Sequence, residues 1–477
     1  MNEFWVGWLL PALFAALLAL TVPLRWLSWV ARGYVVYLTV ALAGIVSGWY
    51  RLADPVATWL YVTGTLLVAV GTWYSVPYIE REGRLHHWNA SQRRGYWSTW
   101  AIFSGSLLGA CLLDNYLAIW LAIEVATLSS VYLTGLPGVR TALEASWKYL
   151  FVTEAGGFAA LVGTIWVVAG SGRAIQAWTF NPPLVHQTIS PQAVAVGCLL
   201  VVIGYATKAG LAPFHTWLPD AHSEAPAPVS ALLSGLKLAV ALVAAYRLLT
   251  LVERQVPLAW TQVPLIALGL CSLVVGAALI GFQHDLKRLW AYSSIEHLGL
   301  ISLGMGFGGL ALVGAFLHIW THGVTKSLLF HNSGTIRLLY STSDHRRGAR
   351  AILQTTPWTG SALALGTAAI LGLPPLAPFW SEWLILVGGL QQPHTRIVAL
   401  VAIALVMVVF VATTRRMPQW LWTPGRADAT PYSQHAEPMA LVTPSLVLMV
   451  LAIAGGLALP VAMPSLWQGV SQQLFGA

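Results

Sequence analysis

The chain has 477 residues, of which 57% are hydrophobic and only 9% are charged, and its mean hydropathy is +0.70. An average soluble domain carries about 25% charged residues, so this composition excludes a water-soluble globular protein. The formal net charge of +8 does not require a nucleic-acid partner, because membrane topology accounts for the excess of basic residues.

Apolar runs of about 20 residues, long enough to cross a bilayer, recur along the whole chain. Each run is expected to be an α-helix, because the runs are too long and unbroken for barrel strands. The fold class is therefore predicted as an all-α polytopic membrane protein with about 14 transmembrane helices. The first run lacks the basic flank and cleavage site of a signal peptide and is expected to remain as a helix. The predicted spans are 4–23, 34–50, 56–79, 97–113, 116–134, 146–170, 193–217, 226–250, 261–282, 289–306, 310–338, 359–389, 396–413 and 438–462.

The basic residues predict the orientation of these spans. Most lie in the loops reached after odd-numbered helices, and the opposite loops hold only Arg51, Arg173, Arg247, Arg254 and Arg396. Because short loops rich in Lys and Arg stay in the cytoplasm, both termini are expected on the periplasmic side of a bacterial inner membrane.

Lysine and arginine are distributed differently. Four of the five lysines, Lys148, Lys208, Lys237 and Lys326, fall inside apolar segments, whereas the arginines lie in loops or at helix ends. Arginine stays protonated in proteins, whereas a buried lysine can release its proton near neutral pH. A single buried lysine could still form a structural ion pair or extend to the interface. Lys148 fits that reading best, because Glu144 precedes it by one helical turn.

Other titratable residues also lie inside apolar segments. Glu124 and Glu382 are in predicted spans, where a charge costs at least ~3 kcal/mol. His318, His322 and Lys326 follow one another at steps of four residues, so they share one face of a helix. A lone histidine is more often a core residue with satisfied hydrogen bonds, but three titratable groups on one stripe favour a functional role.

Proline interrupts two of the predicted helices. Pro213 follows Lys208, and Pro374 and Pro375 precede Glu382. Proline removes a backbone donor and breaks the helix, and broken helices in corresponding halves of a chain indicate an ion site. Helices 4–8 are accordingly predicted to repeat as helices 9–13, in inverted orientation. The predicted divisions are 1–95 for helices 1–3, 96–255 and 256–415 for the two repeats, and 416–477 for the last loop and helix.

The sequence contains no recognisable cofactor motif. Cys111, Cys198 and Cys271 are far apart and form no C-x-x-C pair, which favours buried packing over metal ligation. No P-loop, dinucleotide-binding or haem motif is present. No cofactor, metal or catalytic residue is therefore expected in this chain, and its classification as part of an enzyme stays open.

Two stretches resemble a known family. KAGLAPFHTWLPDAHSEAPAPVSALLSGLKL (208–238) and HDLKRLWAYSSIEHLGLISLG (284–304) are similar to signature stretches of the antiporter-like, proton-conducting subunits of respiratory complex I, Mrp cation/proton antiporters and group 4 hydrogenases. The run from Ser293 to His297 and the compact length most resemble the hydrogenase-4 component F type. The resemblance implies 14 helices, two inverted five-helix repeats and broken helices 7 and 12.

The resemblance also implies roles for individual residues. Glu124 and Lys208 match the family's Glu–Lys pair, in which the carboxylate modulates the proton affinity of the lysine. Lys237 matches a relay residue of helix 8, and Glu382 matches the exit-side residue of helix 12. The helix 11 group is matched by His318, His322 and Lys326. Further candidates for the pathway or its entry are Glu144, Lys148, Glu154, His215, Asp220, His222, Glu224, Glu296 and His297.

The assignments of these further candidates differ. Glu154 has no family counterpart that can be named. Asp220, His222 and Glu224 lie in a bridge between two spans, where they either collect protons or are ordinary surface charges.

The predicted function is proton translocation within a multisubunit redox-driven complex, along a mid-membrane axis of Glu, Lys, His and Glu side chains. The expected partners are other membrane subunits and lipid, with no nucleic acid. Protons are favoured over Na⁺, because an ammonium group cannot ligate a cation. The alternatives are a subunit of a cation/proton antiporter or inorganic-carbon uptake complex, and a scaffold subunit that does not conduct.

Overall fold

The computed structural model describes residues 2–47, 54–170, 191–252, 256–424 and 437–475. Within these ranges the chain forms helices joined by turns, and no strand is present. The chain divides into two compact units, Met1–Pro264 and Leu265–Ala477. The predicted boundary between the repeats, at residue 255, lies outside the described residues, as do Arg51, Arg173 and Arg254 of the topology prediction.

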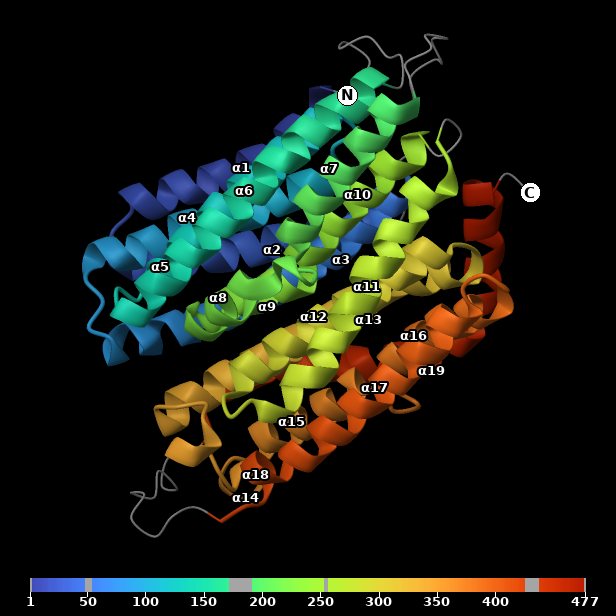
Figure 1. The fold of residues 1–477 in the computed structure, drawn as a ribbon. Helices are drawn as coiled ribbons and strands as arrows, with labels where there is room; N and C mark the ends of the chain where they lie inside the picture. The colour runs from blue at the N-terminus through green and yellow to red at the C-terminus, as the bar shows by residue number, and fades with distance from the viewer. Residues whose placement is uncertain (1, 48–53, 171–190, 253–255, 425–436, 476–477) are drawn as a thin grey trace. The chain divides into compact units, whose positions relative to one another are not determined.

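The first unit is drawn from blue to green in Figure 1. Helix α6 packs against α5 and α7, and α10 also contacts α7. These are the helices that carry the candidate site. The helices of this unit are α1 (Asn2–Thr21), α2 (Leu27–Val46), α3 (Pro55–Leu85), α4 (Ala90–Leu112), α5 (Tyr116–Gly135), α6 (Arg140–Gly170), α7 (Pro191–Ala209), α8 (Leu218–Glu224), α9 (Ala227–Leu232) and α10 (Leu238–Val252).

The second unit is drawn from yellow-green to red in Figure 1. Helix α13 is central, because it contacts α12, α15, α16 and α19. Its helices are α11 (Gln262–Leu279, which begins at the boundary), α12 (Leu286–Phe307), α13 (Gly309–Tyr340), α14 (Ile352–Thr355), α15 (Pro357–Ile370), α16 (Ala377–Gln391), α17 (Arg396–Arg416), α18 (Pro418–Leu421) and α19 (Met439–Phe475).

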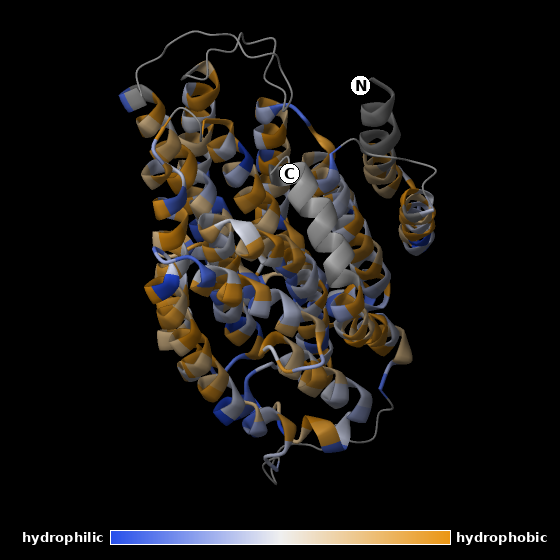
Figure 2. Ribbon diagram, turned by 90° about the vertical axis from the view of Figure 1, so that its right-hand side faces the viewer, coloured by the Kyte–Doolittle hydropathy of each residue, from blue (hydrophilic) through white to orange (hydrophobic). Residues whose placement is uncertain are grey.

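Large apolar side chains lie on the surface of many helices. On α17, Ile397 is 75% exposed and Met407 is 57% exposed, and Figure 2 shows helices that are mostly orange, the colour of hydrophobic residues. Exposing such a surface to water costs roughly 25 cal/mol per Å², so lipid is the solvent that fits it. The chain is an integral membrane protein.

Nine helical segments in the described part of the chain are long and apolar enough to span a membrane. Helices α12 and α13 are not among them, although both are long. The physical reason is that they carry the buried Lys, His and Glu side chains described below, which lower their hydropathy. The nine are Leu24–Ile45, Pro55–Leu85, Tyr116–Gly135, Arg140–Ala169, Val194–Glu224, Ala227–Val252, Leu258–Phe282, Arg396–Leu421 and Met439–Val461.

Polar residues fix where several helices begin. The Asn89 side chain accepts a hydrogen bond from the Gln92 amide at 2.9 Å, and the Gln92 side chain accepts one from the Asn89 amide. This reciprocal cap starts α4 at Ala90, seven residues before the predicted span. Asn115 caps α5 in the same way by accepting from the Ala118 amide at 3.0 Å.

Both predicted helix interruptions are present. Helix α7 ends at Ala209, and a single turn over Phe214–Trp217 follows Pro213. Helix α15 ends at Ile370, and α16 does not begin until Ala377, beyond Pro374 and Pro375. Gly210 (φ +69°) and Gly372 (φ +64°) lie in these breaks with left-handed backbone, which glycine adopts without steric cost.

A third irregularity has no signal in the sequence. Between α9 and α10, residues Leu233–Lys237 are π-helical and end on the buried Lys237. Short π-helical turns inside helices occur often at functional sites.

The burial of the lysines differs in part from the sequence prediction. Lys148 lies in an apolar segment, but its side chain is 50% exposed and pairs with Glu144, which confirms the ion-pair alternative. Lys287, the fifth lysine, lies outside the predicted spans and counts as a basic loop residue in the topology prediction. That assignment is wrong, because Lys287 lies in α12 and is 1% exposed. The bridge with Asp220 is not a plain surface turn either, because it forms α8 and buries His222.

Candidate functional site

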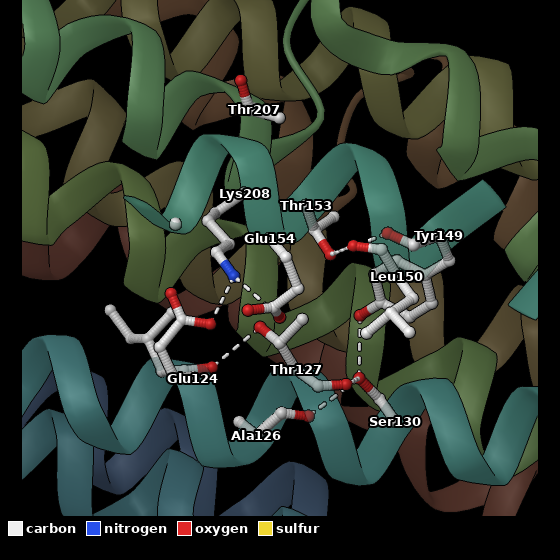
Figure 3. Close-up of polar contacts among 12 residues, drawn as sticks. Glu124, Ala126, Thr127, Ser130, Tyr149, Leu150, Thr153, Glu154, Thr207 and Lys208 are labelled. Carbon is white, nitrogen blue, oxygen red and sulfur yellow. Dashed lines mark hydrogen bonds and ion pairs between the residues drawn. The ribbon is translucent and has the colours of Figure 1, made fainter. Parts of the chain in front are cut away.

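Three helices of the first unit bring one lysine and two glutamates together (Figure 3). Lys208 Nζ, near the end of α7, lies 2.6 Å from Glu124 Oε2 on α5 and 3.6 Å from Glu154 Oε1 on α6. The Lys208 and Glu124 side chains are 1% and 8% exposed, whereas Glu154 is 39% exposed. One ammonium group therefore faces two carboxylates, one buried and one accessible.

Gly157 allows the Lys208 and Glu124 side chains to approach each other beside α6. A Cβ atom on Gly157 of α6 would lie 2.1 Å from Glu124 Oε1 and 2.8 Å from Lys208 Nζ. No side chain fits there without displacing the ion pair. The Gly157 carbonyl also accepts a hydrogen bond from Trp120 Nε1 of α5 at 2.9 Å, which links the two helices beside the pair.

Lys237 has a different environment. Its ammonium group donates to the Tyr149 hydroxyl and lies 4.6 Å from the centre of the Tyr149 ring and 5.6 Å from that of Trp217. The two rings are stacked at 4.3 Å. No carboxylate forms an ion pair with Lys237 in the described part of the chain, so hydroxyl and aromatic faces replace a counter-ion.

Tyr149 and Trp217 also connect Lys237 to neighbouring elements. The Tyr149 hydroxyl lies 2.7 Å from Ser130 Oγ on α5, and Trp217 Nε1 donates to the Thr207 carbonyl at 3.0 Å, next to Lys208. Sequence reasoning did not single out Tyr149. An aromatic residue in an apolar helix gives no signal of such a contact.

The exposed candidates form a separate group on α6 and α8. Lys148 Nζ lies 2.7 Å from Glu144 Oε1, the predicted i,i+4 pair, and 3.3 Å from Asp220 Oδ2. Glu224 accepts from the Thr141 hydroxyl at 3.1 Å. His215 is half-buried in the turn after Pro213.

The second unit brings histidines of two helices together. His318 Nε2 on α13 lies 3.1 Å from His297 Nδ1 on α12, and the His322 ring centre lies 5.5 Å from that of His297. The predicted stripe of His318 and His322 is thus joined by His297. In the sequence analysis His297 was only a lower-ranked candidate for the pathway. Helical periodicity relates residues within one helix, so it could not show that His297 of α12 meets His318 of α13.

Two glutamates flank these rings. Glu382 Oε1 on α16 lies 3.6 Å from His297 Nδ1, and Glu296 Oε2 lies 3.4 Å from His297 Nε2. Ser381, next to Glu382, lies 2.8 Å from His318 Nδ1. All of these side chains are buried.

Lys326 makes its own set of contacts beside this cluster. Its ammonium group donates to the Trp290 carbonyl at 2.9 Å and lies 5.8 Å from the centre of the Trp290 ring. Lys237 and Lys326 therefore share an environment, since each buried ammonium group lies beside a tryptophan ring.

The three cysteines lie apart from these clusters. Cys111 and Cys198 are buried as predicted, Cys271 is partly exposed, and all three are free thiols.

Comparison with known proteins gives consistent matches. The family model for the transmembrane NADH:quinone oxidoreductase/Mrp antiporter proteins matches residues 114–408. The hydrogenase-4 component F homolog of Methylacidiphilum infernorum is 37% identical over 375 residues, which cover 77% of this chain and 78% of that protein.

Solved structures match over almost the whole chain. A chain of respiratory complex I from Thermus thermophilus superposes with a TM-score of 0.80 at 21% identity, covering 97% of this chain and 98% of its own. A chain of the Mrp complex from a Dietzia species superposes with a TM-score of 0.79 at 18% identity, covering 99% and 98%. At these identities the likeness establishes the fold, and both structures are multisubunit membrane complexes.

Proposed function

Since the chain belongs to the NADH:quinone oxidoreductase/Mrp antiporter transmembrane family, we propose that it is a proton-translocating membrane subunit of a multisubunit redox-driven complex. The observation that carries this proposal is the contact of Lys208 with Glu124 and Glu154. A buried ion pair is a poor device for stability alone, because desolvation offsets its attraction. Its value here lies in controlling a proton.

The energetics of the pair suit proton transfer. At an effective dielectric constant near 20, two charges about 4 Å apart attract by roughly 4 kcal/mol. An ionised Glu124 stabilises the ammonium form of Lys208 by an energy of that order, and separating the two groups withdraws it.

Glu154 supplies a second carboxylate for the same ammonium group. With all three groups ionised the cluster carries one net negative charge, so it can hold one further proton without becoming positive. Glu154 is the most exposed of the three, and we propose that water reaches the pair beside it.

The proposed pathway uses the buried groups described above, bridged by water. In the order implied by the family resemblance, the proton passes Glu124, Lys208 and Lys237, then His318, His322 and Lys326, and leaves by Glu382. Asp220 and Glu224 are proposed to collect protons at the entry. H⁺ is the proposed ion, because ammonium groups repel Na⁺ and cannot ligate it.

The topology belongs to the same proposal. About 14 membrane crossings, with helices 4–8 and 9–13 as inverted repeats, agree with the length of the apolar runs and with the two proline breaks. The distribution of arginine favours a bacterial inner membrane with both termini in the periplasm.

The driving reaction is proposed to take place in a partner subunit. The component F homolog named above favours a hydrogenase-type complex. An NADH-quinone oxidoreductase is the other redox-driven complex that fits the same proposal. A cation/proton antiporter or an inorganic-carbon uptake complex is the second candidate. A scaffold that does not conduct is disfavoured by the cost of keeping buried lysines.

Purification of the chain from its native membrane in mild detergent, with mass spectrometry of co-eluting subunits, tests this assignment. We expect redox subunits, either a nickel–iron hydrogenase subunit or a set of NADH dehydrogenase subunits. Co-elution with small antiporter subunits alone would contradict a redox-driven complex and support the second candidate.

A further inference from the structure

Three potential metal ligands from three helices converge in the second unit. His297 of α12, His318 of α13 and Glu382 of α16 each direct one ligand atom to a common point, and these atoms lie within 4.8 Å of one another. The distance is 3.1 Å from His297 Nδ1 to His318 Nε2 and 3.6 Å from His297 Nδ1 to Glu382 Oε1. Around a tetrahedral Zn²⁺ with bonds of about 2.0–2.1 Å, neighbouring ligand atoms are roughly 3.3 Å apart. These two distances lie on either side of that value, and the third pair, His318 Nε2 and Glu382 Oε1, lies within 4.8 Å.

The hydrogen bonds around His318 prepare its Nε2 atom as a ligand. Ser381 Oγ lies 2.8 Å from His318 Nδ1, 2.9 Å from the Pro378 carbonyl oxygen and 2.8 Å from Thr321 Oγ1. When the Ser381 hydroxyl donates to that carbonyl, its oxygen accepts the Nδ1 proton of His318, and the lone pair of His318 lies on Nε2. A hydrogen bond from the distal nitrogen is the usual support of a metal-bound histidine.

Glu296 has the corresponding relation to His297. Its Oε2 atom lies 3.4 Å from His297 Nε2, the ring nitrogen on the far side from the cluster. A carboxylate facing the distal nitrogen favours the proton there and releases Nδ1 for a metal. Both imidazoles therefore have an outer partner suited to metal binding.

Glu382 completes the set. Its Oε1 atom is buried and accepts no hydrogen bond from any described residue, which is costly for a carboxylate oxygen unless a cation compensates it. Its other oxygen packs against Gly372, where a Cβ would lie only 2.4 Å from Oε2. Gly372 is partly exposed in the break between α15 and α16, so the break gives the carboxylate a short route to the surface.

We propose that His297, His318 and Glu382 form a binding site for Zn²⁺, with a fourth position open to water. Two imidazoles and one carboxylate are ligands that Zn²⁺ accepts, whereas Mg²⁺ and Ca²⁺ prefer oxygen ligands throughout. The ammonium group of Lys326, two helical turns from His318 on α13, is an opposing charge that acts on both His297 and His318. It donates a hydrogen bond to the Trp290 carbonyl. The proposal goes beyond the proposed function. His318 and Glu382 also belong to the proposed pathway, so its test measures Zn²⁺ binding and not ion transport.

Equilibrium binding of radioactive Zn²⁺ to the purified complex, treated first with a chelator, tests the site. Metal sites in partner subunits are the same in all variants, so a difference in bound Zn²⁺ between variants comes from this chain. The wild-type complex should bind one more Zn²⁺ per copy of this chain than a complex that carries His318→Gln or Glu382→Gln. Ser381→Ala keeps all three ligands and should weaken that binding about 10- to 100-fold, as loss of an outer partner does. Should the ligand variants fail to assemble, Ser381→Ala alone decides the matter.

His331→Gln is the matched control, because His331 is also a buried histidine of α13 but lies about 20 Å further along the helix axis. It should bind Zn²⁺ like wild type. X-ray absorption of the bound zinc should show two imidazole nitrogens and an oxygen. Binding that is equal in wild type, His318→Gln and Ser381→Ala, or zinc bound by oxygen alone, would overturn the proposal.

Discussion

Lys208 Nζ on α7 and Glu124 Oε2 on α5 form a 2.6 Å ion pair between two buried side chains that are 84 residues apart in the sequence. The pair lies just before the break that ends α7 at Ala209. At this break the Ala206 carbonyl accepts a hydrogen bond from the Leu211 amide, and the Thr207 carbonyl accepts from the Gly210 amide and from Trp217 Nε1. The end of the helix beside the ion pair is thus closed by hydrogen bonds.

The first prediction concerns the stability of this pair. Glu124→Gln or Lys208→Met should each lower the free energy of unfolding by about 3–5 kcal/mol, because each leaves one buried charge without its partner. The double variant should lose less than the sum of the two. Thermal unfolding of the purified protein checks this through a double-mutant cycle, and additive losses would show that the two side chains are not coupled.

The second prediction concerns the glycine beside the pair. Gly157→Ala should displace Glu124 and Lys208 and reduce both stability and proton transport, since its Cβ would overlap the carboxylate. Gly33→Ala is the control, because a Cβ there meets no atom within 4 Å. It should stabilise its helix by up to about 1 kcal/mol. Equal effects of the two substitutions on transport would contradict the proposed role of Gly157.

The third prediction tests the hydroxyl that contacts Lys237. Tyr149→Phe keeps the ring over which the ammonium group lies but removes the oxygen shared with Lys237 and Ser130. Proton transport should fall several-fold, with a stability loss of about 1–3 kcal/mol. Tyr96→Phe removes an equally buried hydroxyl, bonded to Ser75 in the same unit, and should leave transport unchanged. The two variants are compared by acidification of membrane vesicles.

The fourth prediction separates the two carboxylates. Glu154→Gln should slow proton transport less than Glu124→Gln does, because Glu154 is more exposed and lies 1 Å further from the ammonium group. A Glu154→Gln defect as large as that of Glu124→Gln would instead make the two carboxylates equivalent. Initial rates of vesicle acidification at several pH values measure the difference.

Local signals in the sequence predict the helices and their breaks well. Long apolar runs and the prolines at 213, 374 and 375 act through nearby backbone atoms, so they can be read without a structure. The predicted nearness of Glu124 to Lys208 came from the family resemblance, because periodicity cannot relate residues of different helices. The same limit explains why Tyr149 was missed.

Burial of charged residues is harder to predict. Lys148 lies in an apolar stretch, yet it reaches the surface because Asp220 and Glu144 hold it there. Lys287 lies in a polar stretch, yet the packing of α12 buries it. The expectation of no metal site rested on the cysteines, and the convergence of His297, His318 and Glu382 depends on the packing of three helices.

The most direct test of proton translocation through Lys208 is the number of protons moved per redox turnover by the assembled complex in sealed vesicles. For Lys208→Ala this ratio should fall sharply or to zero, and likewise for Glu124→Gln. The controls Arg84→Ala and Glu80→Gln, which remove an exposed cation and its exposed carboxylate partner, should keep the wild-type ratio. Wild-type ratios in both Lys208→Ala and Glu124→Gln would contradict the account.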